Sequence, residues 1–324
     1  FGRSAKSIME QCRKNIASYL NVSPAEIIFT SGGTEADNLA LRSTVRDLGV
    51  NEIITSKVEH HAVLHTAIQL QTEYDIKVSY VQLDENGTVD YNHLETLLKS
   101  DTKKLVSLMH INNEVGNILD IKRVGDLCKA NNALFHTDTV QSVGHYHLDL
   151  QNINIDFLAA SAHKFHGPKG VGFCFIRAAS GLKPLIFGGE QERGYRAGTE
   201  SLHNIVGMDE ALNIAYLNLE VESKYIKSLK RYFIDSLNHK LADCHFNGTS
   251  GDLEKSTYTL INVCLPLPPE KVAMLQFQLD LKGIACSKGS ACQSGSNMAS
   301  HVLSAFLPED RLKRPSVRFS LSKY

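Results

Sequence analysis

Short apolar segments alternate with helical ones along the first half of the chain, and this alternation constrains the fold more than any other feature. Strand-like runs occupy 26–30, 52–56, 78–81, 105–110, 133–136, 157–160 and 171–176, and helical patterns separate most of them, as at 35–49 and 121–130. Strands that alternate with helices are typical of a parallel sheet with helices on both faces. The sequence therefore predicts an α/β fold with a mainly parallel sheet.

The chain is long enough for two domains. Its 324 residues exceed the size of a typical single domain. A long helical region at 202–241 is followed by strand-like segments at 257–263, 284–286 and 317–321 and by a helix at 270–282. We expect a large α/β domain over 1–240 and a smaller α+β domain over 241–324. At the other end, Ile8, Cys12, Ile16 and Leu20 mark the apolar face expected of a helix at 4–20.

Charge and cysteine content exclude several classes of function. The net charge is −1 and neither sign forms a long run, so neither nucleic acid nor an anionic membrane is expected as the main partner. No stretch resembles a spanning helix or a signal peptide. The seven cysteines include no C-x-x-C pair, so we expect no metal site and no disulfide framework, and reduced thiols favour a cytoplasmic location. The chain begins at Phe1 without a methionine, and we expect it to be part of a longer protein.

Polar side chains recur directly after the predicted strands. They are Ser31 to Thr34, His60, Asn113, Asp138 with Gln141, and Ser161 to Lys164. In an open parallel sheet the carboxyl ends of the strands line one crevice, where ligands bind. We therefore expect these side chains to converge.

Each of these positions has a functional and a purely structural interpretation. The segment 31–34 is suited to cradle a phosphate at a helix N-terminus, but it also suits an ordinary capped helix. Asp138 is suited to pair with a protonated ring nitrogen or to cap the next helix. His60 is suited to stack on a flat ring or simply to be half-buried. Lys164 is suited to hold an aldehyde as a Schiff base through a partly desolvated amine, or to extend into water from a strand end. Together they describe the parts of a pyridoxal phosphate site.

Eight motifs give this pattern a family resemblance. In chain order they are S-G-G-T-E-A-D-N, V-E-H-H-A-V, H-I-N-N-E-V-G, H-T-D-T-V-Q-S-V-G, S-A-H-K-F-H-G-P-K-G-V-G, R-G-Y-R-A-G-T, G-S-A-C-Q-S-G-S and R-P-S-V-R-F-S-L. They resemble the cysteine desulfurases of the NifS/IscS type, which are pyridoxal phosphate enzymes of the aminotransferase class V family. The resemblance implies the aspartate aminotransferase type I fold. Relative to that pattern, we expect the N-terminal strand segment and the end of the small domain to be missing from this chain.

The resemblance implies a role for each candidate residue. Lys164 resembles the Schiff-base lysine, His60 the residue stacked on the ring, and Asp138 the partner of the pyridine nitrogen. Gln141 and Asn113 resemble contacts to the phenolic oxygen or to the substrate side of the ring. Arg318 resembles the clamp for the substrate carboxylate. The implied phosphate site consists of Gly33, Thr34, Ser161, His163 and, from the second subunit of a homodimer, Thr199.

The resemblance also implies the reaction. Cys292, in a loop of small residues, resembles the cysteine that takes sulfur from L-cysteine as a persulfide, leaving L-alanine. Its competitor, Cys286, follows a strand-like segment and lacks the G-S-A-C match. The sulfur would pass to an acceptor protein, either an iron–sulfur scaffold or a thiolation carrier. The alternatives are a selenocysteine lyase, another class V aminotransferase, or a catalytically idle module of a sulfur-transfer assembly.

Overall fold

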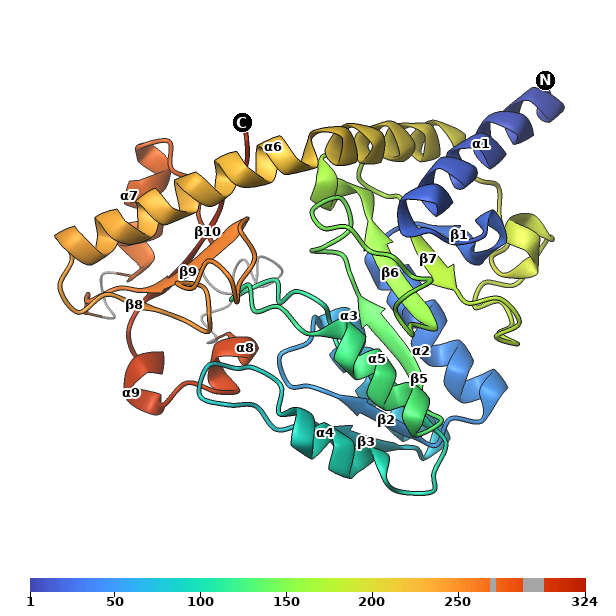
Figure 1. The fold of residues 1–324 in the computed structure, drawn as a ribbon, viewed down its shortest axis with the longest axis horizontal. Coiled ribbons are helices and arrows are strands. Elements are labelled where there is room, and N and C mark those ends of the chain that lie inside the picture. Colours follow the sequence, from blue (N-terminus) through green and yellow to red (C-terminus); the bar gives the residue numbers. More distant parts are fainter. Residues whose placement is uncertain (269–271, 288–299) are drawn as a thin grey trace. The chain divides into compact units, whose positions relative to one another are not determined.

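We analysed a computed structural model, which describes residues 1–268, 272–287 and 300–324 (Figure 1). The chain divides into two compact units. Unit 1 comprises 1–81, 91–110 and 120–219, and unit 2 comprises 82–90, 111–119 and 220–324. Among the helices in the described ranges, none combines the length and the apolar character that crossing a membrane requires.

Unit 1 is built on a seven-stranded sheet with the order β1-β7-β6-β5-β4-β2-β3. Neighbours from β6 to β3 pair in parallel, whereas β7 is antiparallel to both β1 and β6. The α/β fold with a mainly parallel sheet is thus confirmed. The strands are β1 (Ile27–Thr30), β2 (Glu52–Thr55), β3 (Lys77–Tyr80), β4 (Lys104–Ser107), β5 (Leu134–Asp138), β6 (Phe157–Ser161) and β7 (Gly172–Ile176).

Helices cover both faces of this sheet. Figure 1 shows α5 in front of the strands and α2 behind them. Apolar side chains of α2 and α3 pack on those of the strands in one core, which includes Ile28, Leu39, Val63 and Cys174. The helices are α1 (Gly2–Leu20), α2 (Gly33–Leu48), α3 (His61–Tyr74), α4 (Tyr91–Leu98) and α5 (Ile121–Ala130), with short 3-10 turns at Pro24–Glu26, Ala162–Phe165 and Gln191–Gly194.

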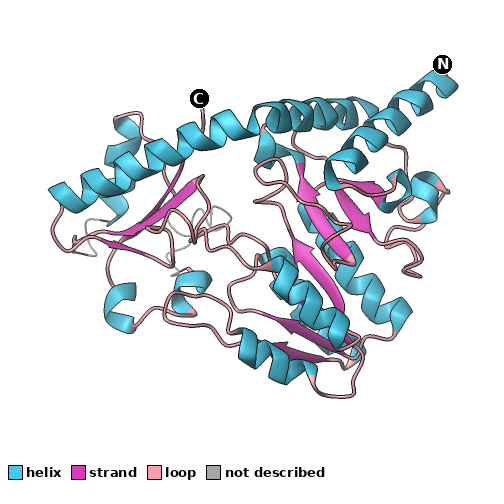
Figure 2. Ribbon diagram, in the orientation of Figure 1, coloured by secondary structure: helices cyan, strands magenta, loops and turns pink. Residues whose placement is uncertain are grey.

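Unit 2 contains a three-stranded antiparallel sheet with the order β10-β9-β8 (Figure 2). Ile261 and Val263 of β9 form its core with Val317 of β10 and Ile234 of the long helix. The strands are β8 (His245–Phe246), β9 (Leu260–Cys264) and β10 (Ser316–Ser320). The helices are α7 (Val272–Leu281), α8 (His301–Ser304) and α9 (Glu309–Leu312), while α6 (Leu202–Lys240) has residues in both units.

The division into units differs from the single boundary expected at residue 240. Two earlier loops, 82–90 and 111–119, belong to unit 2 because long-range contacts hold them there. Asn117 donates to the carbonyl of Asn86 and accepts two hydrogen bonds from Thr249. The carbonyl of Asn113 accepts from Arg318. Residues 284–286, expected as a strand, form none, and only Ser287 bridges to β10.

The buried face of α1 also differs from the expected one. Ile8 is 48% exposed, and Met9 is buried in its place. The buried stripe runs through Met9, Cys12, Arg13 and Ile16 and therefore includes an arginine. Arg13 reaches Glu192 with two hydrogen bonds of 2.7 Å, and Glu192 also accepts from the amide of Phe29. The pair is almost fully buried, with side-chain exposures of 1% each.

We expect Glu192→Gln to lower the free energy of unfolding by about 3 kcal/mol, because it removes the buried one of the two carboxylates that pair with Arg13 and leaves only the partly exposed Glu10. Glu73→Gln, which breaks the exposed pair with Arg42, serves as the control and should cost less than about 1 kcal/mol. Urea titration of both variants measures the difference. Equal losses would show that the buried pair contributes no more than a surface one.

Candidate functional site

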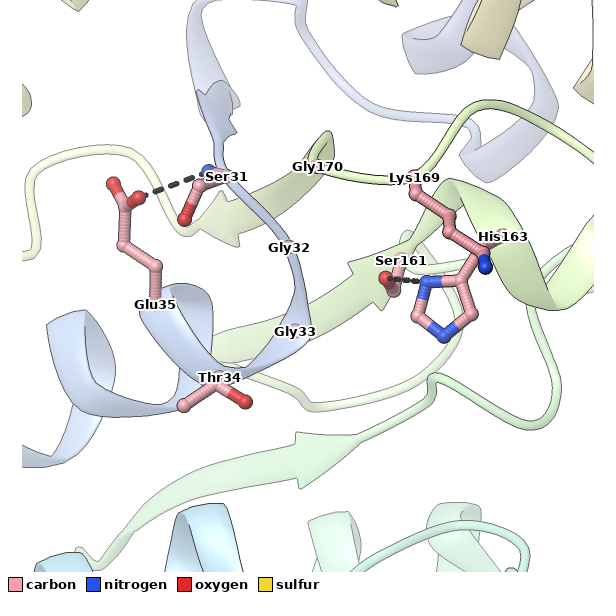
Figure 3. Close-up of a pocket in the computed structure, with 9 residues that line it drawn as sticks. All are labelled: Ser31, Gly32, Gly33, Thr34, Glu35, Ser161, His163, Lys169 and Gly170. Atoms are coloured by element: carbon pink, nitrogen blue, oxygen red, sulfur yellow. Dashed lines mark hydrogen bonds between the residues drawn. The ribbon is translucent and has the colours of Figure 1, made fainter. Parts of the chain in front are cut away.

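The end of β1 and the start of α2 enclose a cavity of about 330 Å³ in unit 1 (Figure 3). Residues of β6 and of the turn before β7 complete its wall. The lining residues are Ser31, Gly32, Gly33, Thr34, Glu35, Ser161, His163, Lys169 and Gly170. The site lies where the sequence predicted a ligand crevice, at the carboxyl ends of neighbouring strands.

The backbone of this cavity suits an anion. The first N–H groups of a helix have no partner within it and carry the positive end of its dipole, and here they belong to α2. Gly33 must be a glycine, because a Cβ there would lie 2.6 Å from Cγ2 of Val140. Gly32 has φ +150°, which also favours glycine. The turn therefore brings backbone donors close to the cavity, where they could bind a phosphate.

The side chains of the cavity balance its charge. Ser161 Oγ and His163 Nδ1 are 2.9 Å apart. Burial, together with the charges of Lys164 and Lys169, lowers the pKa of His163, so its ring is neutral at pH 7. Burial alone would raise the pKa of Glu35, but hydrogen bonds from Arg196 and from the Ser31 amide outweigh it and lower that pKa. Arg196 thus offsets the one carboxylate that faces the anion cavity.

Asp138 is buried at the end of β5, with 4% of its surface exposed. Burial and then the charge of Asp37 raise its pKa to about 7, whereas the Val140 amide and the charge of Lys164 act in the opposite direction. A buried carboxyl of this kind becomes fully ionised when a cation comes within reach. Its setting therefore fits a protonated ring nitrogen as its partner.

His60 and Gln141 also follow strands of the same sheet. His60 precedes α3 as its N-cap, and its Nδ1 accepts a hydrogen bond of 3.1 Å from the Ala62 amide. The neutral ring therefore carries its proton on Nε2. Gln141 is half-buried, three residues after Asp138. His60 caps a helix and Gln141 follows a strand. These positions do not test the expected contacts to the cofactor, which stay predictions.

Lys164 lies in the 3-10 turn after β6, and its backbone carbonyl is 2.9 Å from Nε2 of His145. The residue is exposed in the single chain, and the partial desolvation of its amine stays a prediction. The turn that follows β6 places it at the surface end of the strand. Its charge nevertheless acts on Asp138, which locates the amine on the site side of the sheet.

Two further candidates meet within unit 2. Arg318 of β10 donates from Nη1 to the carbonyl of Asn113 over 2.7 Å. The Oδ1 atom of Asn113 is buried and has no hydrogen-bond partner among the described residues. Glu114 is fully buried beside them; burial raises its pKa, although Ser300 and the charges of His301 and Arg318 lower it. The structure therefore joins the Arg318 guanidinium to the main-chain carbonyl of Asn113, while the side-chain oxygen of the same residue lacks a donor among the described residues.

The cysteines separate into two groups. Cys292 lies outside the described residues. The other six are free, and burial is the first cause that raises the thiol pKa of each of them. Cys286, the competitor in sequence, is one of these six. Since the thiolate is the reactive form, none of the six is suited to nucleophilic chemistry.

Sequence reasoning did not single out every residue of this site. Glu35, Lys169 and Gly170 line the cavity, and Arg196 reaches it through Glu35. The motifs at 31–38 and 161–172 contain the first three, which is the signal that could have found them. Thr199 is exposed and is not among the lining residues, so its contribution to a second subunit stays a prediction.

The fold and site of unit 1 define an α/β protein with an anion cradle at the strand ends of its sheet, the arrangement of enzymes that hold phosphorylated ligands. The sequence model of the family named aminotransferase class-V matches residues 1–324. The chain therefore belongs to the aminotransferase class V family, among the cysteine desulfurases of the NifS/IscS type. Enzymes of this family depend on pyridoxal phosphate.

Relatives and solved structures support this membership in detail. A putative cysteine desulfurase IscS 1 of Bacillus subtilis (strain 168) is 42% identical, over 99% of this chain and 83% of its own length. The cysteine desulfurase IscS of Dictyoglomus turgidum is 39% identical, over 100% and 81%. A solved NifS-like protein superposes with a TM-score of 0.89 at 36% identity, over 100% of this chain and 84% of its own. The solved structure described as SspA in complex with cysteine gives a TM-score of 0.84 at 30% identity, over 100% and 89%.

Proposed function

We propose that the chain is a pyridoxal phosphate-dependent cysteine desulfurase that removes sulfur from L-cysteine as a persulfide on Cys292 and releases L-alanine. The observation that carries this proposal is the arrangement in unit 1 of an anion cradle, a buried Asp138 and the charge of Lys164 acting on it. The choice of L-cysteine is supported by the relatives named cysteine desulfurase.

The residues present fit the cofactor. The amides at the start of α2, with Gly33, Thr34, Ser161 and His163, would hold its phosphate. The ionised form of Asp138 would hold the proton of its ring nitrogen, and Lys164 would hold its aldehyde carbon through the amine. His60 would lie against the ring, with Gln141 and Asn113 at the phenolic oxygen. When bound, pyridoxal phosphate supplies an electron-withdrawing ring that makes the Cα proton of an attached amino acid acidic.

The protein's own groups then move protons and sulfur. The guanidinium of Arg318 would bind the substrate carboxylate with two parallel hydrogen bonds. The amine of Lys164 would remove the Cα proton, with His60 as a second proton carrier. The Cys292 thiolate would attack the substrate sulfur, so that an S–S bond forms and the Cβ–S bond breaks. The electron pair left on Cβ takes up a proton, the ammonium of Lys164 would return a proton to Cα, and alanine is released.

A product assay tests this function. Purified protein loaded with pyridoxal phosphate and given L-cysteine should form alanine and protein-bound sulfane sulfur in equal amounts. Much faster turnover of L-selenocysteine would instead indicate a selenocysteine lyase. A second amino acid formed from an added keto acid would indicate an aminotransferase. If no substrate turns over, the chain is an idle module and the proposal fails.

The partners belong to the same proposal. We infer a homodimer in which Thr199 completes the phosphate site of the other subunit, a cytoplasmic location, and an acceptor protein for the sulfur, either an iron–sulfur scaffold or a thiolation carrier. The exposure of Thr199 supports the first of these. Sedimentation of the loaded protein measures whether it is a dimer. Thr199→Ala should weaken cofactor binding while the sedimenting species keeps the mass of a dimer.

A further inference from the structure

A group of ionisable side chains is buried in unit 1 around Asp138. Asp37 of α2 is 1% exposed, His136 of β5 is fully buried, and Glu59, which precedes α3, is 1% exposed. Glu59 accepts hydrogen bonds from the Met109 amide and from Ser56 Oγ. Asp37 has no comparable donors and, within the described ranges, no ion pair with a lysine or arginine. The protein has therefore buried a carboxyl group that its surroundings hardly solvate.

The nearest polar partner of Asp37 is His136. Asp37 Oδ1 lies 3.4 Å from His136 Nε2 without forming an aligned hydrogen bond, and neither atom has a hydrogen-bond partner in the described part of the chain. The other ring nitrogen, Nδ1, is 2.8 Å from Ser107 Oγ of β4. His136 and Asp138 are two residues apart in β5 and so point to the same face of the sheet. A continuous chain of polar atoms thus runs from Asp37 through His136 to Ser107.

The charges in this group favour a neutral Asp37. Burial raises the pKa of Asp37 to about 8 and lowers the pKa of His136 to about 4, so both groups are uncharged at pH 7. The groups that face Asp37 are His136, Asp138, Glu59 and the Cys174 thiol, none of which is a cation at this pH. The pKa of Asp138 is raised less, to about 7, because the Val140 amide and the charge of Lys164 lower it, so Asp138 ionises before Asp37.

We propose that Asp37 is a positioning residue of the cofactor site: its carboxyl group is neutral, donates its proton to Nε2 of His136, and leaves the negative charge of this buried group on Asp138. This role rests on the proposed function, because it concerns the carboxylate that would face the cofactor's ring. His136 then carries its own proton on Nδ1 and donates it to Ser107 Oγ. These hydrogen bonds fix the orientation of the His136 ring. Because Asp37 carries no negative charge, Asp138 can ionise.

Two carboxylates buried near each other cannot both ionise without a large cost, and the charge of Asp37 raises the pKa of Asp138, which gives Asp37 its effect on the site. Ionised Asp37 would compete with Asp138 for the available positive charge. A cation at the ring nitrogen makes Asp138 the more stable anion, so loading with the cofactor holds Asp37 neutral more firmly. Asparagine at position 37 copies the neutral acid in shape and charge, whereas leucine copies only its size.

Infrared and nuclear magnetic resonance spectra of the loaded protein test this role directly. At pH 7 we expect a protonated-carboxyl C=O band from Asp37 that Asp37→Asn removes; Glu59, whose pKa burial also raises to about 8, should give a separate band that only Glu59→Gln removes. Nitrogen-15 spectra of histidine-labelled protein should show His136 protonated on Nδ1 in the wild type and in Asp37→Asn. A His136 ring protonated on Nε2, or no band lost in Asp37→Asn, would overturn the proposal. The wild-type spectrum needs no variant to fold.

The pH dependence of stability provides a second test. A raised pKa means that the folded state favours the neutral acid, so this contribution to stability is complete below the ordinary pKa and is lost as the pH rises through about 8. The Asn variant lacks the titrating group and should therefore lose less stability than the wild type between pH 4 and pH 9. Parallel curves would contradict a neutral Asp37. None of these readouts depends on sulfur release. A protein that fails the product assay can therefore still confirm or refute the proposed role of Asp37.

Discussion

Lys164→Ala is expected to abolish the visible absorbance of the bound cofactor and to slow alanine formation by about 10⁴-fold or more. The amine at this position would hold the cofactor's aldehyde carbon and also remove the Cα proton, so its loss affects two steps together. Absorbance of the purified variant, before and after addition of pyridoxal phosphate, measures the first effect. Single-turnover formation of alanine measures the second.

Lys169→Ala is a matched control, because this lysine lies in the same connection between β6 and β7, is also exposed and lines the anion cavity. It should keep the visible absorbance but bind pyridoxal phosphate more weakly, since only a charge near the phosphate is removed. The assignment of Lys164 is contradicted if its alanine variant keeps the colour and Lys169→Ala loses it. The two lysines would then have exchanged roles.

Cys292→Ala should keep the visible absorbance and lose protein-bound sulfane sulfur and sulfur release almost completely. The nucleophile would be removed while the cofactor site of unit 1 stays intact. Cyanolysis of the protein after incubation with L-cysteine measures the bound sulfur. A coloured Cys292→Ala variant with undiminished desulfuration would refute the assignment.

Cys286→Ala provides the comparison at the competing thiol. Cys286 is half-buried, and burial followed by the charge of Asp280 raises its thiol pKa. A thiol in that setting is a poor nucleophile at pH 7, so the variant should retain sulfur release within about twofold of the wild type. Loss of bound sulfur in Cys286→Ala alone would transfer the reactive role to this cysteine.

Sequence periodicity predicted the sheet and the strand-end positions well because both depend on local pattern. The apolar strands end at Thr30, Asp138 and Ser161, and each is followed by residues of the site. Pairs of residues far apart in the chain could not be found in this way. Arg13 and Glu192 are 179 positions apart, and the sequence around Arg13 predicts only one side of an amphipathic helix.

In the candidate site, too, contacts between residues far apart in the chain could not be predicted from the sequence. Glu35 lies inside a recognisable motif, but nothing near it indicates that Arg196 is its partner. Asp37 occupies a helix interior, where an aspartate usually faces water; here the adjacent strand presents His136 instead. The exposure of Lys164 could not be predicted from the sequence for a related reason, since it depends on how the turn after β6 is placed. Burial of polar groups is set by tertiary packing, which periodicity does not encode.

The raised pKa values of six thiols have a practical consequence for chemical labelling. Alkylating reagents consume thiolate, so cysteines held in the protonated form react slowly near neutral pH. Cys12, Cys128, Cys174 and Cys264 are also buried from solvent. A maleimide probe applied to the folded protein should therefore meet a low background from these four. Cys244 and Cys286 are only half-buried, so they are the two thiols to replace before a fluorophore is attached elsewhere in the chain.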